Sequence, residues 1–452
     1  MKFKRYKPYQ KYKDSKVEWL GEIPEHWNVV SFKRLGYFQA GAGFPDEEQG
    51  LSDQELPFYK VSDTNLQGNE VWMNVENNTV SRKIATKLRA FVLPPETIIF
   101  AKVGAALLLN KRRILSKPAC IDNNMMGFIR TCCELKWIFY WMCGLDLGRL
   151  ANPGAVPSIN ENQIKEIVVP VPVVEEQREI GRFLDRETAK IDALIEKKER
   201  LIELLQEKRT ALITHAVTKG LDPNVPMKDS GVEWIGEIPE HWDLIPLKFI
   251  TAAKKGSVKT GPFGSQLLTS EMMSEEIKVY NQRNVIDRNF TEGENYVTHD
   301  KFAQLIDFNI YPNDVLITTR GTIGQCAVFP STAEAGILHP CLMRVQTNPK
   351  KMIPKYLALL IQDSSIIKLQ LLLMSNATTI DVIYSDSLKD VQLPLPPVFE
   401  QEGILDEVEK RVKQHNLLIQ KTKESIERLR EYRTALISAA VTGKIDVREE
   451  AA

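Results

Sequence analysis

The stretch YNQRNV, residues 280–285, puts Asn281, Gln282, Arg283 and Asn284 in consecutive positions. An arginine can donate two hydrogen bonds to the major-groove edge of guanine, and an asparagine or glutamine can pair in a similar way with adenine. This run of side chains is therefore a candidate for reading bases in DNA. Asn also favours turns, so a purely structural turn is the competing interpretation.

Other loops combine turn residues with polar and basic groups. DTN at 63–65 and DNN at 122–124 carry amides and carboxylates, and TRGTIG at 319–324 is either a phosphate-contacting glycine turn or a tight structural loop. Basic residues gather at 87–89, 110–113 and 254–265, and seven Lys and Arg lie within the first sixteen residues. Contacts to phosphate need such local clusters, although each one alone is also typical of a solvated surface.

Length and composition limit the class of protein. The chain has 452 residues, with 59 Lys and Arg against 59 Asp and Glu, and this length predicts two or more domains. No apolar run is long enough to cross a bilayer, and the N-terminal segment lacks the apolar core of a signal peptide, so we expect a cytoplasmic protein. The six cysteines show no CxxC spacing, which favours free thiols over a zinc site.

An internal repeat organises the chain. Residues 13–27 and 228–242 differ only at Lys16/Gly231 and Leu20/Ile235, and both end in GEIPEHW. A second repeat, offset by 224 residues, begins with VPVPVVEEQ at 169 and LPLPPVFEQ at 393, and contains RTALI at 209 and 433. His26 and His241 lie within the first repeat, which favours a structural role over a catalytic one.

The segments between the repeated ends share only fragments, such as PFYKVSDTN with KVYNQRNVI and IIFAKVG with VLITTRG. A constant scaffold with two divergent inserts predicts two related recognition surfaces. Gene duplication with neutral drift of the inserts is the alternative. Short apolar or alternating runs broken by Gly, Asn and Asp indicate mixed, β-rich inserts. Buried helices are expected near 135–146 and 354–373, with Trp137 and Trp141 in the core.

Each repeat also predicts one helix of about 40 residues, roughly 60 Å long, which ends at Gly220 or Gly443. Apolar residues recur at spacings of four and three, the heptad pattern of a coiled coil. The seam comprises Ile191, Ile195, Ile202, Leu205 and Leu212 in the first helix and Ile419, Ile426, Leu429 and Leu436 in the second, with Lys198, Arg209, His415, Thr422 and Arg433 at its polar positions. We expect the helices to pack together as an antiparallel coiled coil. A seam facing a partner protein, or a helix packed on its own insert, are the alternatives.

These motifs together resemble the specificity subunits of Type I restriction-modification systems. The resemblance covers essentially the whole chain and is carried by the twin GEIPEHW segments, GPFGSQL at 261–267, YNQRNV, DVLITTRGTIG, LHPCLMRV at 338–345, the LPLPP entry and the RTALI helix exit. It implies an α+β fold in which two target recognition domains are joined by two long helices with a pseudo-twofold internal repeat. We accordingly predict domains at 1–168, with a basic tail at 1–16, and at 221–392, and helices at 169–220 and 393–452.

The resemblance also implies a function and partners. Each recognition domain would read one half of a bipartite, asymmetric site in double-stranded DNA, and the helices would set the spacer and bind methyltransferase subunits. Two adenine methyltransferase subunits and two motor-nuclease subunits would perform the chemistry with S-adenosylmethionine, ATP and Mg, so this chain would be non-catalytic and hold no metal or cofactor of its own. The absence of a G-x-x-x-x-G-K-[ST] loop and of an Asn/Asp-Pro-Pro-Tyr/Phe tetrapeptide agrees with this reading.

Within such recognition domains we expect particular residues to contact DNA. They are Lys60, Asp63, Asn65, Lys102, Lys111, Arg112, Arg113 and Asn123 in the first, and Lys259, Ser265, Asn281, Gln282, Arg283, Arg320 and Thr322 in the second. His339, in LHPC, is equally compatible with a turn and with DNA contact. The competing functions are a nuclease or methyltransferase fused to its reader, a non-catalytic protein-binding scaffold of a phage-defence complex, and an anti-restriction relative.

Overall fold

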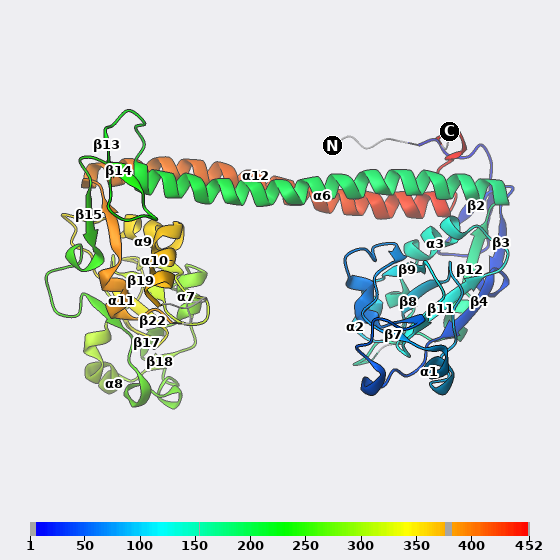
Figure 1. Cartoon of the computed structure of the whole chain (residues 1–452), viewed down its shortest axis with the longest axis horizontal. Helices are drawn as coiled ribbons and strands as arrows, with labels where there is room; N and C mark the ends of the chain where they lie inside the picture. Colours follow the sequence, from blue (N-terminus) through cyan, green and yellow to red (C-terminus); the bar gives the residue numbers. More distant parts are fainter. Residues whose placement is uncertain (1–5, 153, 376–381, 451–452) are drawn as a thin grey trace. The chain divides into compact units, whose positions relative to one another are not determined.

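The computed structural model describes residues 6–152, 154–375 and 382–450. They form two compact units: unit 1 comprises Met1–Lys198 and Glu424–Ala452, and unit 2 comprises Glu199–Lys423 (Figure 1). Each unit combines short strands with helices, which confirms the predicted α+β class and the internal repeat. Residues 1–5 of the predicted basic tail lie outside the described residues.

Unit 1 contains a five-stranded sheet and a three-stranded sheet. The first has the order β4 (Gly36–Ala40), β11 (Met125–Arg130), β8 (Ile98–Ala101), β9 (Arg112–Leu115) and β6 (Trp72–Met73), and the second has the order β10 (Cys120–Ile121), β5 (Leu56–Tyr59) and β7 (Thr79–Val80). Its helices are α1 (Arg82–Lys87), α2 (Ala105–Leu108), α3 (Leu135–Gly144), α4 (Leu147–Leu150), α5 (Glu161–Lys165) and the 3-10 turns η1 (Phe32–Arg34), η2 (Asp46–Glu48), η3 (Val61–Asn65) and η8 (Arg448–Glu450).

Unit 2 repeats this plan with different residues. A four-stranded sheet has the order β16 (Val258–Thr260), β22 (Leu342–Val345), β19 (Val315–Thr318) and β20 (Cys326–Val328), and a three-stranded sheet has the order β18 (Tyr296–Val297), β17 (Ile277–Tyr280) and β21 (Gly336–Leu338). Its helices are α7 (Gln282–Ile286), α8 (His299–Gln304), α9 (Pro354–Gln362), α10 (Ser365–Ser375), α11 (Ser385–Asp390) and the 3-10 turns η4 (Leu247–Phe249), η5 (Gly264–Gln266), η6 (Thr269–Glu271) and η7 (Ile306–Phe308).

Strand pairing shows that the two inserts share most of their topology, with β6 as an additional edge strand in unit 1. In unit 1, β5 pairs in parallel with β10 and antiparallel with β7; in unit 2, β17 pairs in parallel with β21 and antiparallel with β18. In the larger sheets β8 lies between β9 and β11, as β19 lies between β20 and β22. The fragments shared by the two inserts, PFYKVSDTN with KVYNQRNVI and IIFAKVG with VLITTRG, therefore occupy the same places in the fold.

Two long helices carry the second repeat. They are α6 (Val174–Lys219) and α12 (Val398–Val441), each preceded by a strand, β12 (Val168–Val171) or β23 (Gln392–Leu395), that pairs with β3 (Asn28–Ser31) or β15 (Asp243–Pro246). Gly220 and Gly443 follow the helices with φ of 75° and 72°, the left-handed conformation that ends a helix. The predicted borders after residues 168, 220 and 392 lie close to these ends.

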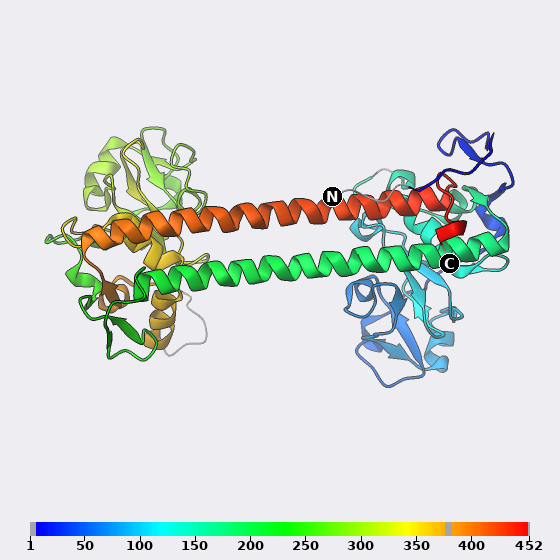
Figure 2. The same ribbon diagram turned by 90° about the horizontal axis from the view of Figure 1, so that it is seen from above.

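Within each unit, one end of α6 lies beside the opposite end of α12 (Figures 1 and 2). In unit 1, Ile191 of α6 shares a core with Leu429 and Leu436 of α12, and in unit 2 the C-terminal turns of α6 share a core with Ile404 and Val408 of α12. The chain directions are therefore opposite within each unit.

None of the nine apolar residues of the predicted seam is exposed. Ile191, Ile426, Leu429 and Leu436 are buried, and Ile195, Ile202, Leu205, Leu212 and Ile419 are half-buried. Among the polar positions, Arg433 pairs with Asp192 of α6 through contacts of 2.9 and 3.2 Å, whereas Arg209 donates to Asp363 of the insert at 2.9 Å. Continuous coiled-coil packing along the whole seam stays a prediction.

The GEIPEHW segments join the long helices to the inserts. Each adds a strand, β2 (Glu22–Pro24) or β14 (Glu237–Pro239), to the preceding β1 (Tyr12–Asp14) or β13 (Met227–Asp229), and each buries its tryptophan completely at Trp27 or Trp242. A Cβ added to Gly443, just past α12, would lie 2.3 Å from Pro24, and one added to Gly220, just past α6, would lie 3.3 Å from Trp242. Each segment thus packs against the end of one long helix.

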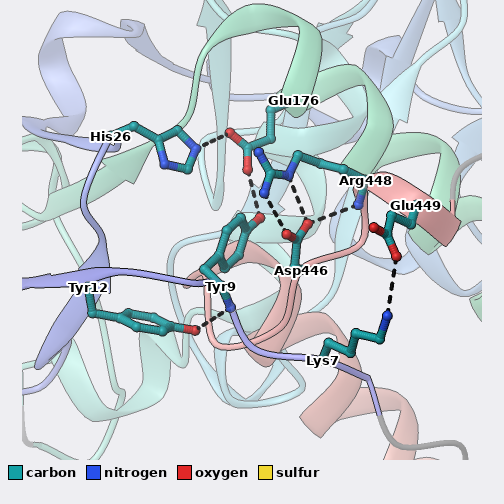
Figure 3. A network of polar contacts seen from close by, with 8 residues as sticks. All are labelled: Lys7, Tyr9, Tyr12, His26, Glu176, Asp446, Arg448 and Glu449. Atoms are coloured by element: carbon teal, nitrogen blue, oxygen red, sulfur yellow. Dashed lines mark hydrogen bonds and ion pairs between the residues drawn. The ribbon is translucent and has the colours of Figure 1, made fainter.

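The same segments also bind the start of the other long helix. His26 Nε2 lies 2.8 Å from Glu176 of α6, and His241 Nε2 lies 2.7 Å from Glu400 of α12. In unit 1 the hydroxyl of Tyr9 donates to Glu176 at 2.7 Å, beside the Asp446–Arg448 ion pair of the C-terminal tail (Figure 3). The repeat is needed because both units must build this junction, and the structural role expected for the two histidines is confirmed.

The structure also bears on the predictions for the tryptophans, the cysteines and membrane spans. Trp137 and Trp141 of α3 are 0% and 3% exposed and belong to the core of unit 1, as expected. All six cysteines are free thiols, with Cys132 exposed and Cys120, Cys133 and Cys326 buried. In the part of the chain that the structure describes, no single helix is long and apolar enough to span a membrane, although the bent pair Pro354–Gln362 and Ser365–Met374 together meets those limits.

Candidate nucleic-acid interface

The candidate site of unit 2 begins where β17 ends and α7 starts. The backbone N–H of Asn281 donates to Asn284 Oδ1 at 3.0 Å, and Asn281 Oδ1 accepts from the N–H of Arg283 at 2.9 Å. This capping arrangement uses both asparagines to hold the turn. Gln282 and Arg283, between them, are left to face outward; the Arg283 side chain is 87% exposed and pairs with Asp287 at 3.4 Å.

These residues border a hollow on the surface of unit 2. Its volume is about 580 Å³, and it is lined by Asn281, Gln282, Arg283, Ile286, Asp287, Asn295, His339 and Cys341. The three predicted contact residues of YNQRNV are therefore brought together. The sequence reasoning did not anticipate that Ile286, Asp287, Asn295 and Cys341 would join them.

The TRGTIG turn adjoins this hollow. Gln282 Nε2 donates to the backbone carbonyl of Arg320, and the Arg320 guanidinium lies 5.0 Å from the ring centroid of Phe263. The aromatic face holds the cation by a cation–π contact. Arg320 and Thr322 are exposed, and so is Ser265, two residues beyond Phe263. The Gln282–Arg320 hydrogen bond and the Arg320–Phe263 contact thus link three segments that carry predicted contact residues.

Lys259 lies apart from this group. It is half-buried on β16, with Nζ 4.7 Å from the ring centroid of Phe308 and 4.0 Å from Asp307. Its charge is already engaged by an aromatic face and a carboxylate.

His339 is held in the turn after β21. Its N–H donates to the carbonyl of Tyr280 at 3.0 Å, and its ring Nδ1 accepts from the N–H of Cys341 at 3.2 Å. Burial lowers the pKa of the imidazole below its ordinary value, because desolvation disfavours the charged ring. The ring is accordingly neutral at pH 7, with its proton on Nε2.

Hydrogen bonds align the same loops in unit 1 residue by residue. Lys60 donates its N–H to Asp63 Oδ2 at 2.7 Å, as Asn281 does to Asn284, and Asp122 donates its N–H to the Tyr59 carbonyl at 3.0 Å, as His339 does to Tyr280. Isolated bridges pair Val103 with Ser158 and Arg320 with Val382. Ser62 therefore stands in place of Arg283, and Val103 stands in place of Arg320.

Five residues that were predicted to contact DNA in the first recognition domain lie at or near these loops. Lys60 is half-buried, and its Nζ donates to Gln49 at 2.7 Å; Lys111 Nζ donates to Asn65 Oδ1. Asn123 is exposed, directly after the Asp122 turn. Lys102 is half-buried, and its backbone N–H donates to the Asn124 carbonyl at 2.8 Å.

The predictions that Asp63 and Arg112 of the first recognition domain contact DNA are wrong, because both residues are buried. The guanidinium of Arg113 is already bound by backbone carbonyls. Asp63 is 1% exposed, and its carboxylate caps η3. Arg112 is 3% exposed, since β9 turns it inward, and it donates to the Leu145 carbonyl at 3.0 Å; burial lowers its pKa to about 10. Arg113 donates to the carbonyls of Thr64 and Arg112. Arg112 and Arg113 are adjacent on β9, where successive side chains point to opposite faces, so the NKRR cluster does not form one basic surface.

Other residues at the loop tips were missed. Ser62, Val61 and Val103 follow directly from the fragment alignments, because PFYKVSDTN places Ser62 opposite Arg283 and IIFAKVG places Val103 opposite Arg320. The signal was therefore present in the sequence. Phe263, by contrast, is identified only by its contact with Arg320.

Comparison with known proteins decides the family. The model of the Type I restriction modification DNA specificity domain matches residues 24–204 and again 267–428. The chain belongs to this family. The two matches cover most of the two inserts and much of both long helices, and they confirm the predicted resemblance to the Type I specificity subunits.

Curated relatives in this family are distant. The chain is 26% identical to the putative type I restriction enzyme MjaX specificity subunit of Methanocaldococcus jannaschii, over 64% of this chain and 62% of the relative, and 24% identical to the MjaVIII specificity subunit of that organism, over 65% of each. It is 22% identical to the EcoBI specificity subunit of Escherichia coli, over 96% of this chain and 89% of the relative. The chain spans less than two thirds of the two archaeal relatives it matches.

Solved structures agree in fold. A chain from a structural study of complex assembly and conformational transition in the type I R-M system matches with a TM-score of 0.64 and 15% identity, over 94% of this chain and 99% of that one. The HsdS subunit from Thermoanaerobacter tengcongensis matches with a TM-score of 0.50 and 16% identity, over 94% and 98%. At these identities the likeness supports the fold of the specificity subunits.

Proposed function

We propose that each unit of this specificity subunit reads one half of a bipartite, asymmetric DNA site. The observation that carries the proposal is that the two inserts share strand order and turn hydrogen bonds while their loop tips differ. Arg283 and Arg320 in unit 2 stand where unit 1 has Ser62 and Val103. Two readers with one scaffold and different tips would recognise two different sequences.

The tips of unit 2 have the chemistry that base reading needs. Arg283, Gln282 and Arg320 present guanidinium and amide donors, which match acceptor groups in the major groove. Arg320 would also contact a phosphate, since it is exposed on the glycine turn after β19. Basic groups in unit 1, such as Lys60 and Lys111, would supply phosphate contacts that hold the duplex in register.

We further propose that α6 and α12 set the spacing of the half-sites and bind the partner subunits. Two half-sites one helical turn apart are about 34–36 Å from centre to centre. In unit 2 these otherwise polar helices expose four leucines, Leu201, Leu204, Leu417 and Leu418, at 43–55%. Exposed apolar residues on a long polar helix favour contact with another protein.

The proposed partners are two adenine methyltransferase subunits and two motor-nuclease subunits. S-adenosylmethionine, ATP and Mg would belong to those partners, and this chain would be non-catalytic and act in the cytoplasm. The competing function is a non-catalytic protein-binding scaffold, and the test below distinguishes the two functions.

The test is single-molecule sequencing of DNA from cells that express this chain with the methyltransferase encoded beside it. We expect methylated adenines in one bipartite motif, which disappear when this chain is deleted. Exchange of residues 243–392 for the equivalent segment of another specificity subunit should change one half of the motif only. Chain-dependent assembly without chain-dependent methylation would favour the scaffold.

A further inference from the structure

The turn after β21 holds a histidine with one ring nitrogen bound and the other free. His339 Nδ1 accepts from the N–H of Cys341 at 3.2 Å, so Nε2 carries the ring proton. Among residues 6–152, 154–375 and 382–450, none accepts a hydrogen bond from Nε2. His339 lines the same hollow as Gln282 and Arg283.

Unit 1 forms the same turn with Asp122, a hydrogen-bond acceptor, in the place of His339, a donor. Asp122 Oδ1 accepts from the N–H of Asn124 at 2.8 Å, which corresponds to the bond from Cys341 to His339. Asp122 Oδ2 accepts from the N–H of Val61 at 3.3 Å, and the residue is 7% exposed. Both carboxylate oxygens of Asp122 therefore already accept hydrogen bonds from backbone N–H groups. At equivalent positions, unit 2 offers a free donor and unit 1 offers none.

We propose that His339 is a specificity-determining residue of unit 2, whose Nε2–H donates to N7 of one guanine while the Arg283 guanidinium donates to O6 of the same base. This inference rests on the proposed function and deepens it. Guanine is the base whose major-groove edge presents two acceptors side by side, whereas adenine replaces O6 with an N6 donor. Two donor-only groups beside one hollow thus select guanine over adenine. Asp287, the carboxylate that lines the hollow, pairs with Arg283 and holds its guanidinium in place.

His339→Asn separates base reading from the fold of the turn. The asparagine Oδ1 can accept the N–H of Cys341, as Asp122 Oδ1 accepts that of Asn124, because Asn and Asp both form this kind of turn. The variant removes the ring donor and leaves the backbone arrangement in place. His299→Asn is the matched control, since His299 is exposed on α8, where it pairs with Glu276 at 2.9 Å, and does not line the hollow.

The first measurement is the methylation motif. With the wild-type chain we expect a guanine at one position of the half-site read by unit 2. His339→Asn should lower the preference for that guanine roughly 5- to 30-fold and leave the other half-site unchanged. His299→Asn should keep the full motif. A motif that His339→Asn leaves unchanged overturns the inference.

The second measurement changes single atoms of the DNA and compares wild type with His339→Asn. The purified complex of this chain with its methyltransferase is bound to duplexes in which each guanine of the half-site is replaced in turn by 7-deazaguanine, which lacks the N7 acceptor. Wild type should lose affinity at one position, and His339→Asn should be insensitive there. Equal sensitivity of both proteins, or no sensitive position, overturns the inference. If wild type shows no chain-dependent methylation, the proposed function fails, and this inference fails with it.

Discussion

Gly443→Ala tests the junction that explains the internal repeat. Gly443 follows α12 with φ of 72°, and an added Cβ would lie 2.3 Å from Pro24 Cδ, 2.7 Å from Pro24 Cγ and 3.2 Å from Trp27. Neither neighbour moves easily, because the proline ring is part of β2 and Trp27 is 0% exposed. The alanine must therefore push the GEIPEHW segment away from the helix end.

Two costs add at this position. A non-glycine residue in the left-handed region costs about 1–2 kcal/mol, and forcing an extra methyl group into a packed core costs about 1–3 kcal/mol. We expect a loss of about 2–5 kcal/mol in the free energy of local opening at this junction. The loss should be confined to unit 1, where Pro24, Trp27 and Gly443 all lie.

Gly231→Ala is the matched control. Gly231 has φ of 73° with no atom within 4 Å of the added Cβ, and the first copy of the repeat carries Lys16 at that position with φ of 58°. We therefore expect a loss of about 1 kcal/mol, from backbone strain alone. In the intact chain, amide hydrogen exchange of residues 17–27 and 436–447 reports the junction of Gly443, and exchange of residues 227–242 reports the surroundings of Gly231. If Gly443→Ala reduces protection no more than Gly231→Ala does, the packing argument is refuted.

Three other substitutions test base reading by Arg283, the burial of Arg112 and the ion pair of Asp446. Arg283→Ala should weaken cognate binding by about 1–3 kcal/mol and relax one base position; unchanged preference in a competition assay would remove Arg283 from the reading surface. Arg112→Met should lower the stability of unit 1 by about 1–3 kcal/mol by leaving the Leu145 carbonyl unpaired, without changing the salt dependence of DNA binding; a shallower salt slope would contradict its burial. Burial opposes ionisation of Asp446, but hydrogen bonds from Arg448 outweigh it and hold the pKa of Asp446 below its ordinary value. The folded chain therefore binds this proton less readily than the unfolded chain, and the stabilisation exists above about pH 4 and disappears as the pH falls through the lower folded pKa. Asp446→Asn should differ from wild type at pH 7 and converge with it in acid unfolding; a constant difference down to pH 2 would count against this contact.

Sequence reasoning succeeded where a pattern was long or repeated. The heptad spacing predicted two helices whose spaced positions, such as Ile191 and Leu436, are buried, because many residues must agree for such a period to persist. The twin GEIPEHW segments predicted a shared scaffold, and the prolines and glycines marked the helix ends. The fragment alignments also matched the two inserts correctly, since buried strands keep their apolar residues when loops diverge.

The individual contact residues were less predictable, because composition does not tell which side of a short element a side chain faces. Arg112 and Arg113 are neighbours in one basic cluster, yet the pleat of β9 buries the first and the carbonyls of Thr64 and Arg112 engage the second. Asp63 looked like a polar loop residue and is a buried cap. A shift of one position along the strand or turn changes whether a side chain is buried or exposed, and composition does not reveal that shift.

The sequence by itself determined the family, the repeat, the long helices and the α+β character of the inserts, because each of these depends on patterns that extend over many residues. Only the tertiary structure decided which loops meet around the hollow of unit 2. Gln282, Arg320 and His339 come from three separate loops, and they are brought together because β17 pairs with β21 while the turn after β19 reaches Gln282. Contacts between residues so distant along the chain are set by strand pairing, which no local pattern encodes.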